Sequence, residues 1–244
     1  MKLPVAIALT AATSWAIAQP YPGSTAVPRP RPATIQVTGE AQVSETPDRV
    51  YIDIGVSTRA PRSEDAASQN AARLATVIAA VKRAAGPGAQ LTTTEYSVSP
   101  DYSYPRGGGT ATVVGYTVSN VVQVRLDDLR RVGGVIDAAT QAGSNTVQNI
   151  RFALRDEQVP RNQALRQAVL NASQDAGALA DALGLKVVRV LAVDEGSPQV
   201  EPVYPRGRVF AQVQAAAAPT PVETGTLDVS ATVTLTVEVA PASR

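Results

Sequence analysis

Residues 227–239, LDVSATVTLTVEV, decide the fold class, because apolar and polar side chains alternate along them without a break. Successive side chains of a β-strand point to opposite faces of a sheet, so this stretch predicts a strand with one buried and one solvated face. The same alternation occurs in residues 35–43 and 50–56, which are separated by the turn Thr46-Pro47-Asp48. Strands of this kind are typical of antiparallel sheet that helices cover on one side only.

Two amphipathic segments follow the first pair of strands. Residues 67–81 carry apolar side chains at three- and four-residue spacing and end before Gly86, which predicts a helix. Residues 129–139 repeat this spacing, with Asp127 as the expected N-cap of a second helix. The alternating segments around them predict strands at 91–99, 114–126 and 147–154.

The predicted elements fall into two lobes. From Tyr51 to Leu154 their order is strand-helix-strand-strand-helix-strand, the β-α-β-β-α-β arrangement of ferredoxin-like folds, over about residues 46–155. Residues 34–45 and 156–240 are expected to form a second lobe from the first strand, a long helix opened near Pro160 and the C-terminal strands. Those strands are expected at 186–193, at 227–239 and, more weakly, at 203–213. The apolar stripe of the long helix is predicted to consist of Leu165, Val169, Ala172, Ala176, Leu179 and Leu183. The predicted fold class is therefore α+β, with antiparallel sheets and helices packed on one face.

The N-terminus has the features of an export leader. Lys2 supplies the positive charge, a short apolar run follows, and Ala16-Ile17-Ala18 fits the small-x-small cleavage rule. We therefore expect residues 1–18 to be removed as a signal peptide, and the proline-rich residues 19–33 to act as a disordered linker. No other segment is apolar for long enough to span a bilayer, so the mature chain is expected to lack a transmembrane segment.

Composition narrows the chemistry that the mature chain can perform. Residues 19–244 contain no His, Cys, Trp or Met, which excludes catalytic triads built on His or Cys and the usual zinc sites. Losing Lys2 with the leader leaves 21 basic and 21 acidic residues, and this zero net charge argues against nucleic acid as a partner. No metal or cofactor is expected.

The adjacent carboxylates are Asp127-Asp128, Asp156-Glu157 and Asp194-Glu195, and a carboxylate-dependent hydrolase is the weakest of the functional alternatives.

A tyrosine-rich segment is the main candidate for a binding surface. Residues 100–109 are expected to form a long turn, and Tyr102, Tyr104 and Arg106 in it are candidates for contact with a partner or a second subunit. Tyrosine is enriched at protein interfaces, and loops rich in Tyr, Ser and Gly form adaptable binding surfaces.

Taken together and in order, these segments resemble the SIMPL-domain family, the YggE-like exported proteins of bacteria, over about residues 33–240. The matching pieces are IQVTGEA at 35–41, TPD at 46–48, GYTVSN at 115–120, DDL at 127–129, IDAA at 136–139, ALG at 182–184 and TPVETG at 220–225. The resemblance implies an exported, non-catalytic protein associated with envelope or oxidative stress. It also implies assembly, since some relatives form large rings, and it carries over no catalytic residue.

We therefore expect a non-enzymatic periplasmic protein that self-associates into a homo-oligomer. The alternative is an envelope binding module that recognises a peptide, glycan or protein through its polar sheet face or its Tyr-rich loop. Release from the cell or association with the outer membrane stays open.

Overall fold

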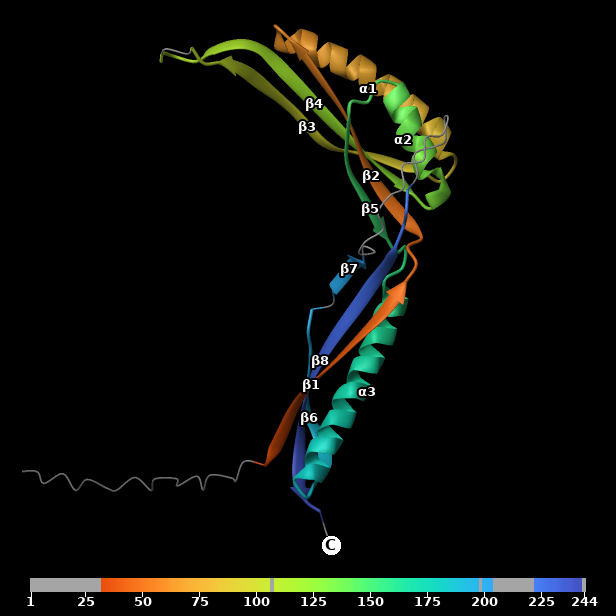
Figure 1. Cartoon of the computed structure of the whole chain (residues 1–244), viewed down its shortest axis with the longest axis vertical. Helices are drawn as coiled ribbons and strands as arrows, with labels where there is room; N and C mark the ends of the chain where they lie inside the picture. The colour runs from red at the N-terminus through yellow and green to blue at the C-terminus, as the bar shows by residue number, and fades with distance from the viewer. Residues whose placement is uncertain (1–31, 106–107, 198, 204–221, 243–244) are drawn as a thin grey trace, which may run out of the picture. The chain divides into compact units, whose positions relative to one another are not determined.

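The computed structural model describes residues 32–105, 108–197, 199–203 and 222–242. The predicted leader, residues 19–31 of the predicted linker, and residues 204–213 of the weak strand lie outside the described residues. The helices are α1 (Ser63–Ala85), α2 (Val132–Gln141) and α3 (Gln158–Ala182), and a short 3-10 turn (Leu129–Arg131) precedes α2. The strands are β1 (Thr34–Glu45), β2 (Arg49–Ala60), β3 (Gln90–Ser103), β4 (Thr112–Leu126), β5 (Thr146–Ala153), β6 (Leu185–Glu195), β7 (Gln199–Val203) and β8 (Thr226–Pro241) (Figure 1).

Four strands form a sheet in the order β3-β4-β2-β5, which we call the β2 sheet. All neighbouring strands in it are antiparallel, and each of the helices α1 and α2 joins two strands that have a third strand between them. Both helices pack on the same face, against alternate residues of β2 and β4. The core there consists of Val50, Ile52, Ile54, Val56, Leu74, Val77, Val81, Val122, Val124, Leu126, Val132 and Val135 with Ala85 and Ala139.

The other strands form the β1 sheet, in which β8 pairs with β1 along one side and with β6 and β7 along the other. Helix α3 covers one face of this sheet. The strand predicted at 227–239 is confirmed, since every second residue from Leu227 to Val239 is buried and the residues between them are half-buried. Two antiparallel sheets, each with helices on one face, confirm the predicted α+β class.

The predicted apolar stripe of α3 is confirmed at Ala172 and Ala176 and wrong at Val169, Leu179 and Leu183. The buried face consists of alanines at every fourth position, namely Ala164, Ala168, Ala172, Ala176 and Ala180. Leu179 and Leu183 are exposed instead, and so is Val169. The reason lies opposite the helix, where Gly39 of β1 brings the two backbones so close that only small side chains fit between them.

Two local predictions are also corrected. The first four residues of the predicted turn, 100–103, belong to β3, because Asp101 accepts hydrogen bonds from Thr117 at 3.0 Å and forms an ion pair with Arg59 at 2.7 Å. A proline at position 100 is tolerated there because β3 is an edge strand. The residue that caps the segment before α2 is Asp128, which accepts a hydrogen bond from the backbone of Arg130, and not Asp127.

Helix α1 is fixed to its sheet by a buried amide. The Nδ2 atom of Asn70 donates to the carbonyl oxygens of Val56 in β2 (2.8 Å) and Val118 in β4 (3.0 Å). Asn70 is 1 % exposed, so these bonds form away from water and help to hold the helix on the two central strands.

Candidate interaction surfaces

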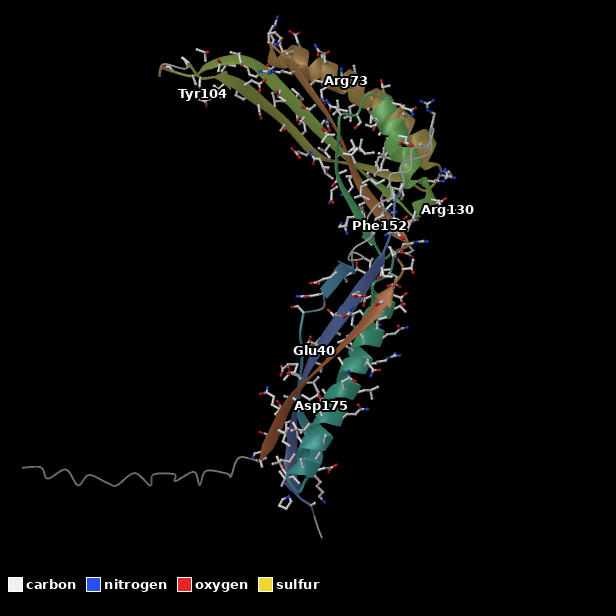
Figure 2. All side chains as sticks on the ribbon, viewed as in Figure 1. Glu40, Arg73, Tyr104, Arg130, Phe152 and Asp175 are labelled. Atoms are coloured by element: carbon white, nitrogen blue, oxygen red, sulfur yellow. The ribbon has the colours of Figure 1, made fainter. Side chains whose placement is uncertain are left out.

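The tip of the β3–β4 hairpin brings two of the predicted contact residues together. Tyr102 lies near the end of β3, opposite Val113 of β4, and Tyr104 follows directly after the strand. Their exposed fractions are 51 % and 74 %, and Val113 and Val114 beside them are also exposed. Figure 2 shows Tyr104 near the outer end of the hairpin, beyond the helices that cover the rest of the sheet. The tip is therefore an apolar and aromatic surface open to solvent.

The third predicted contact residue and two further tyrosines of these strands are placed differently. Arg106 lies outside the described residues. Tyr96 is exposed on the same strand, but six residues before Tyr102, a separation of about 20 Å along an extended strand. Tyr116 is half-buried in β4, opposite Pro100. The structure thus places Tyr102 and Tyr104 in one patch and leaves Tyr96 and Tyr116 out of it.

Strand β6 forms a second surface, which sequence reasoning missed. Three of its valines, Val187, Val190 and Val193, are paired with residues of β8 that are buried under α3, so they lie on the helix side of the sheet. They are nevertheless 40–59 % exposed, because α3 packs mainly over β1 and β8 and covers β6 only in part. We call these three residues the β6 strip. The bulge residues Val188 and Leu191 are exposed next to it.

The opposite, polar face of the β1 sheet is crossed by hydrogen bonds between side chains. Thr38 and Thr234 share one at 3.1 Å. Gln42 and Ser44 both donate to Asp228, and Arg189 forms an ion pair with Glu238 at 2.7 Å. Partners within the sheet therefore satisfy many of these polar groups.

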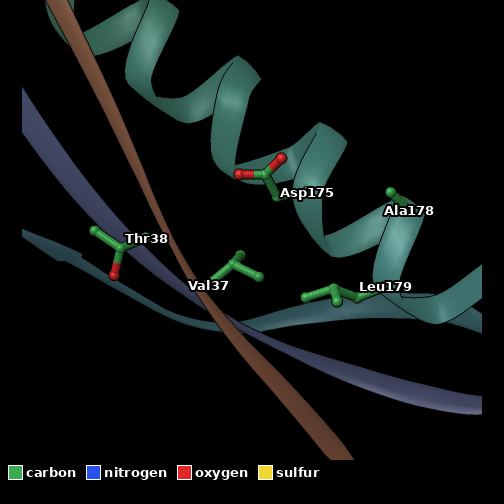
Figure 3. A pocket seen from close by; sticks show the side chains of 5 residues that line it. All are labelled: Val37, Thr38, Asp175, Ala178 and Leu179. Carbon is green, nitrogen blue, oxygen red and sulfur yellow. The ribbon is translucent and has the colours of Figure 1, made fainter.

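A hollow of about 370 Å³ opens between β1 and α3. Figure 3 shows Val37 and Leu179 approaching each other across it, with Asp175 on the helix side. Ala178 and Thr38 complete its lining. The hollow is shallow and contains one ionisable group, so it lacks the several converging polar groups that are typical of a small-molecule site.

The carboxylates singled out by the sequence are engaged in ion pairs and caps. Asp127 accepts a hydrogen bond from Arg49 Nε at 2.8 Å, and this bond lowers the pKa of Asp127 below its ordinary value. Arg130 has the same effect on the pKa of Asp128. A lowered pKa is the opposite of what a general acid needs near neutral pH.

One carboxylate of each of the two other pairs is used similarly. Asp156 accepts a hydrogen bond from the backbone N–H of Gln158 at the start of α3 (2.8 Å). Glu195 forms an ion pair with Arg161 at 2.7 Å, which joins α3 to the end of β6. In the described ranges no three His, Cys, Asp or Glu residues gather closely enough to hold a metal ion. Of the helices that the structure describes, none has the length and apolar content needed to cross a bilayer.

These features define a class of α+β proteins whose sheets are each covered on one face and whose open surfaces are suited to contact. Residues 35–237 match the model of the SIMPL family, which is described as a protein of unknown function (DUF541). The chain belongs to the SIMPL family, and the resemblance found in the sequence is confirmed.

Three relatives illustrate the similarity. The 26 kDa periplasmic immunogenic protein of Brucella melitensis is 31 % identical over 192 residues, which cover 78 % of this chain and 76 % of that protein. The protein YggE of Edwardsiella ictaluri is 25 % identical over 182 residues, 75 % of each chain. YggE of Escherichia coli is 25 % identical over 159 residues, 65 % of this chain and 64 % of its own.

Proposed function

We propose that this chain is a non-enzymatic protein of the bacterial periplasm that acts by self-association, with the β6 strip as its contact surface. A periplasmic location is supported by the leader-like N-terminus and by the name of the Brucella relative. The association with envelope or oxidative stress that the family resemblance implies is part of this proposal.

The exposure of the β6 strip carries the proposal. Three valines on the helix side of a sheet would ordinarily be covered, and exposed apolar patches mark interaction sites in soluble proteins. The strip also lies on an edge strand, whose unpaired backbone groups favour pairing with another chain.

A second copy of this chain suits the strip because of how charge is distributed along β6. Lys186 lies at the beginning of the strand and Asp194 at its end, both on the polar face of the sheet, opposite the β6 strip. Two copies joined edge to edge along β6 by a two-fold axis near Val190 would run antiparallel, so that the two strips meet on one face and Lys186 of each copy approaches Asp194 of the other on the opposite face. Self-complementary patches of this kind form the interfaces of two-fold oligomers.

Two β-bulges in β6 limit the backbone pairing that an exposed edge strand would otherwise favour. The pairing of β6 with β8 shifts after Val187 and again after Val190, and bulges of this kind protect edge strands from continuous pairing. We therefore propose that the two copies meet chiefly through apolar side chains, and less through a continuous ladder of backbone hydrogen bonds.

The test is the molar mass of the mature chain in solution, measured by light scattering at several concentrations. Val190→Asp should shift the mass toward that of a single chain, because it would place two unpaired carboxylates in the contact. Val147→Asp is the matched control, since Val147 is an exposed valine of the other sheet and is 39 % exposed. A wild-type monomer at tens of micromolar, or an unchanged mass for Val190→Asp, would contradict the proposal.

The second candidate function, an envelope binding module, is favoured by the hairpin tip. Tyr102 and Tyr104 offer rigid aromatic area in an exposed position, which is the property of contact residues in binding surfaces. Purified peptidoglycan sacculi serve as the probe in a pelleting experiment. Replacing both tyrosines with Ala should reduce the bound fraction several-fold without changing the molar mass. Tyr96→Ala is the control on the same strand, and equal binding by the double variant and the control would reject this candidate.

A further inference from the structure

The face of the β2 sheet that α1 and α2 leave uncovered carries a row of long polar side chains. Tyr51 of β2 is paired with Arg125 of β4 on one side and with Arg151 of β5 on the other. Its neighbours Val50 and Ile52 point into the core under the helices, so Tyr51 and its two partners lie on the open face. Directly paired residues have their Cβ atoms about 4.5–5.5 Å apart, so two guanidinium groups flank one phenol ring.

One of these guanidinium groups rests on the ring. Arg151 Cζ lies 4.3 Å from the centroid of Tyr51, within the range of a cation–π interaction. This contact orients the side chain of an otherwise exposed arginine, and it leaves most of the five N–H donors of the guanidinium available.

The other guanidinium group has an unused donor. The Nε atom of Arg125 is buried, and no acceptor for it is found among the described residues. A buried donor without an acceptor is unfavourable. This Nε is closed to solvent, so we assign contact with an incoming acceptor to the rest of the Arg125 guanidinium.

The charge of Asp127 acts on Arg125, but the ion pairs of Asp127 are with other arginines. Asp127 is paired with Arg49 at 2.8 Å and with Arg155 at 3.6 Å. Asp53 accepts a hydrogen bond at 3.0 Å from a side-chain amide of β4, and Asp48 accepts one at 2.7 Å from the backbone of Arg155. Within the described ranges, the recorded ion pairs of these carboxylates do not include either guanidinium that flanks Tyr51.

We propose that Arg125 and Arg151, held on either side of Tyr51, bind an oxyanion, namely a carboxylate or a phosphate group. Arginine suits both, because its planar fork of N–H donors matches the oxygens of either group. The site faces solvent on an open sheet, so it accepts the free ion and equally such a group on a larger molecule. It is independent of the proposed self-association, because β6 belongs to the other sheet.

The experiment uses isothermal titration of the intact mature chain with sodium phosphate and, separately, with sodium acetate. Sodium chloride keeps the ionic strength equal throughout, because exposed charges are screened by salt. We expect a saturable response with a Kd on the order of 1 mM for a single small ion. A response to phosphate only, to acetate only or to both supports the site and tells which oxyanion it prefers.

Three variants separate a local site from a general effect of positive charge. Arg151→Gln and Arg125→Gln should each weaken binding about tenfold. Arg155→Gln removes the same charge from a nearby arginine that is engaged with Asp127, and should change binding less than about twofold. Because Arg125 is partly buried, the exposed Arg151 keeps the test valid if Arg125→Gln folds poorly. The absence of a saturable response to either ion, or equal losses in Arg151→Gln and Arg155→Gln, would overturn the proposal.

Discussion

Gly39 of β1 faces Ala172 of α3 so closely that a Cβ atom added at Gly39 would lie 2.8 Å from the Cβ of Ala172. The carbonyl oxygen of Ala168 would be nearer still. Real side chains do not approach this closely, so the contact depends on glycine in the strand and alanine in the helix. This contact explains why α3 buries alanines and exposes its larger apolar residues.

Gly39→Ala is therefore expected to lower the free energy of unfolding by about 1–3 kcal/mol, because the helix must move away from the strand. Gly177→Ala is the matched control within α3, where an added Cβ meets no atom within 4 Å. It should raise the free energy of unfolding by up to about 1 kcal/mol through helix propensity alone. Urea denaturation followed by circular dichroism measures the free energy of unfolding of both variants. If the two substitutions changed it in the same direction, the close contact at Gly39 would be contradicted.

Asn70→Ala is expected to lower the free energy of unfolding by about 1–3 kcal/mol. The change removes two buried hydrogen bonds and leaves the carbonyl oxygens of Val56 and Val118 without this donor. Gln69→Ala, an exposed position on the same helix, should change it by less than about 0.5 kcal/mol. Thermal unfolding of the two variants provides the comparison, and equal midpoints would mean that Asn70 does not anchor α1.

Asp127→Asn is expected to reduce stability at neutral pH and to have little effect in acid. The hydrogen bond from Arg49 lowers the pKa of Asp127 in the folded state, so the stabilisation is present above the unfolded pKa, near 3.8, and is lost as the pH falls through the folded pKa. The pair is partly exposed, so we expect about 1 kcal/mol or less.

Urea midpoints of wild type and Asp127→Asn at pH 7 and at about pH 2.5 test this dependence. Arg49→Gln removes the other half of the pair and should show the same loss at pH 7. A difference between wild type and Asp127→Asn that persists unchanged in acid would show that the charge of Asp127 is not its cause.

A charge exchange tests the antiparallel contact proposed for β6. Lys186→Glu alone should weaken self-association, because it would bring like charges together in the two-fold pair. Adding Asp194→Lys restores opposite charges in an antiparallel arrangement and should recover the wild-type dissociation constant to within about threefold. Sedimentation velocity over a concentration series measures the three proteins. Failure of the double variant to recover would exclude this orientation, though not self-association itself.

Export should remove the segment that contains the chain's one tryptophan, Trp15. The intact mass of protein purified from the periplasm is expected to correspond to a chain that begins at Gln19. Its fluorescence should then be typical of tyrosine. A mass that includes residues 1–18, with tryptophan emission, would show that the leader is retained.

Much of the fold could be predicted because strand alternation is a local property. The period of two in β8 and the helical period in α1 are present in the sequence itself, and the structure places both as expected. Apolar spacing predicted Ala172 and Ala176 of the buried face of α3, but not the remaining residues of that face. Leu179 and Leu183 are the larger apolar residues, but the close backbone approach at Gly39 selects the alanines. A glycine in a strand together with alanines at every fourth helical position was the available signal.

The sequence by itself determined the order of the elements, the alternation of the strands, the absence of His and Cys, and the membership of the SIMPL family. Only the tertiary structure decided that α3 covers β6 only in part, and that Arg125 and Arg151 meet on either side of Tyr51. The physical reason is that periodicity reports which side chains share a face of one element. Which residues become neighbours across strands depends on pairing between segments that are up to about two hundred residues apart, as for Thr34 and Glu238.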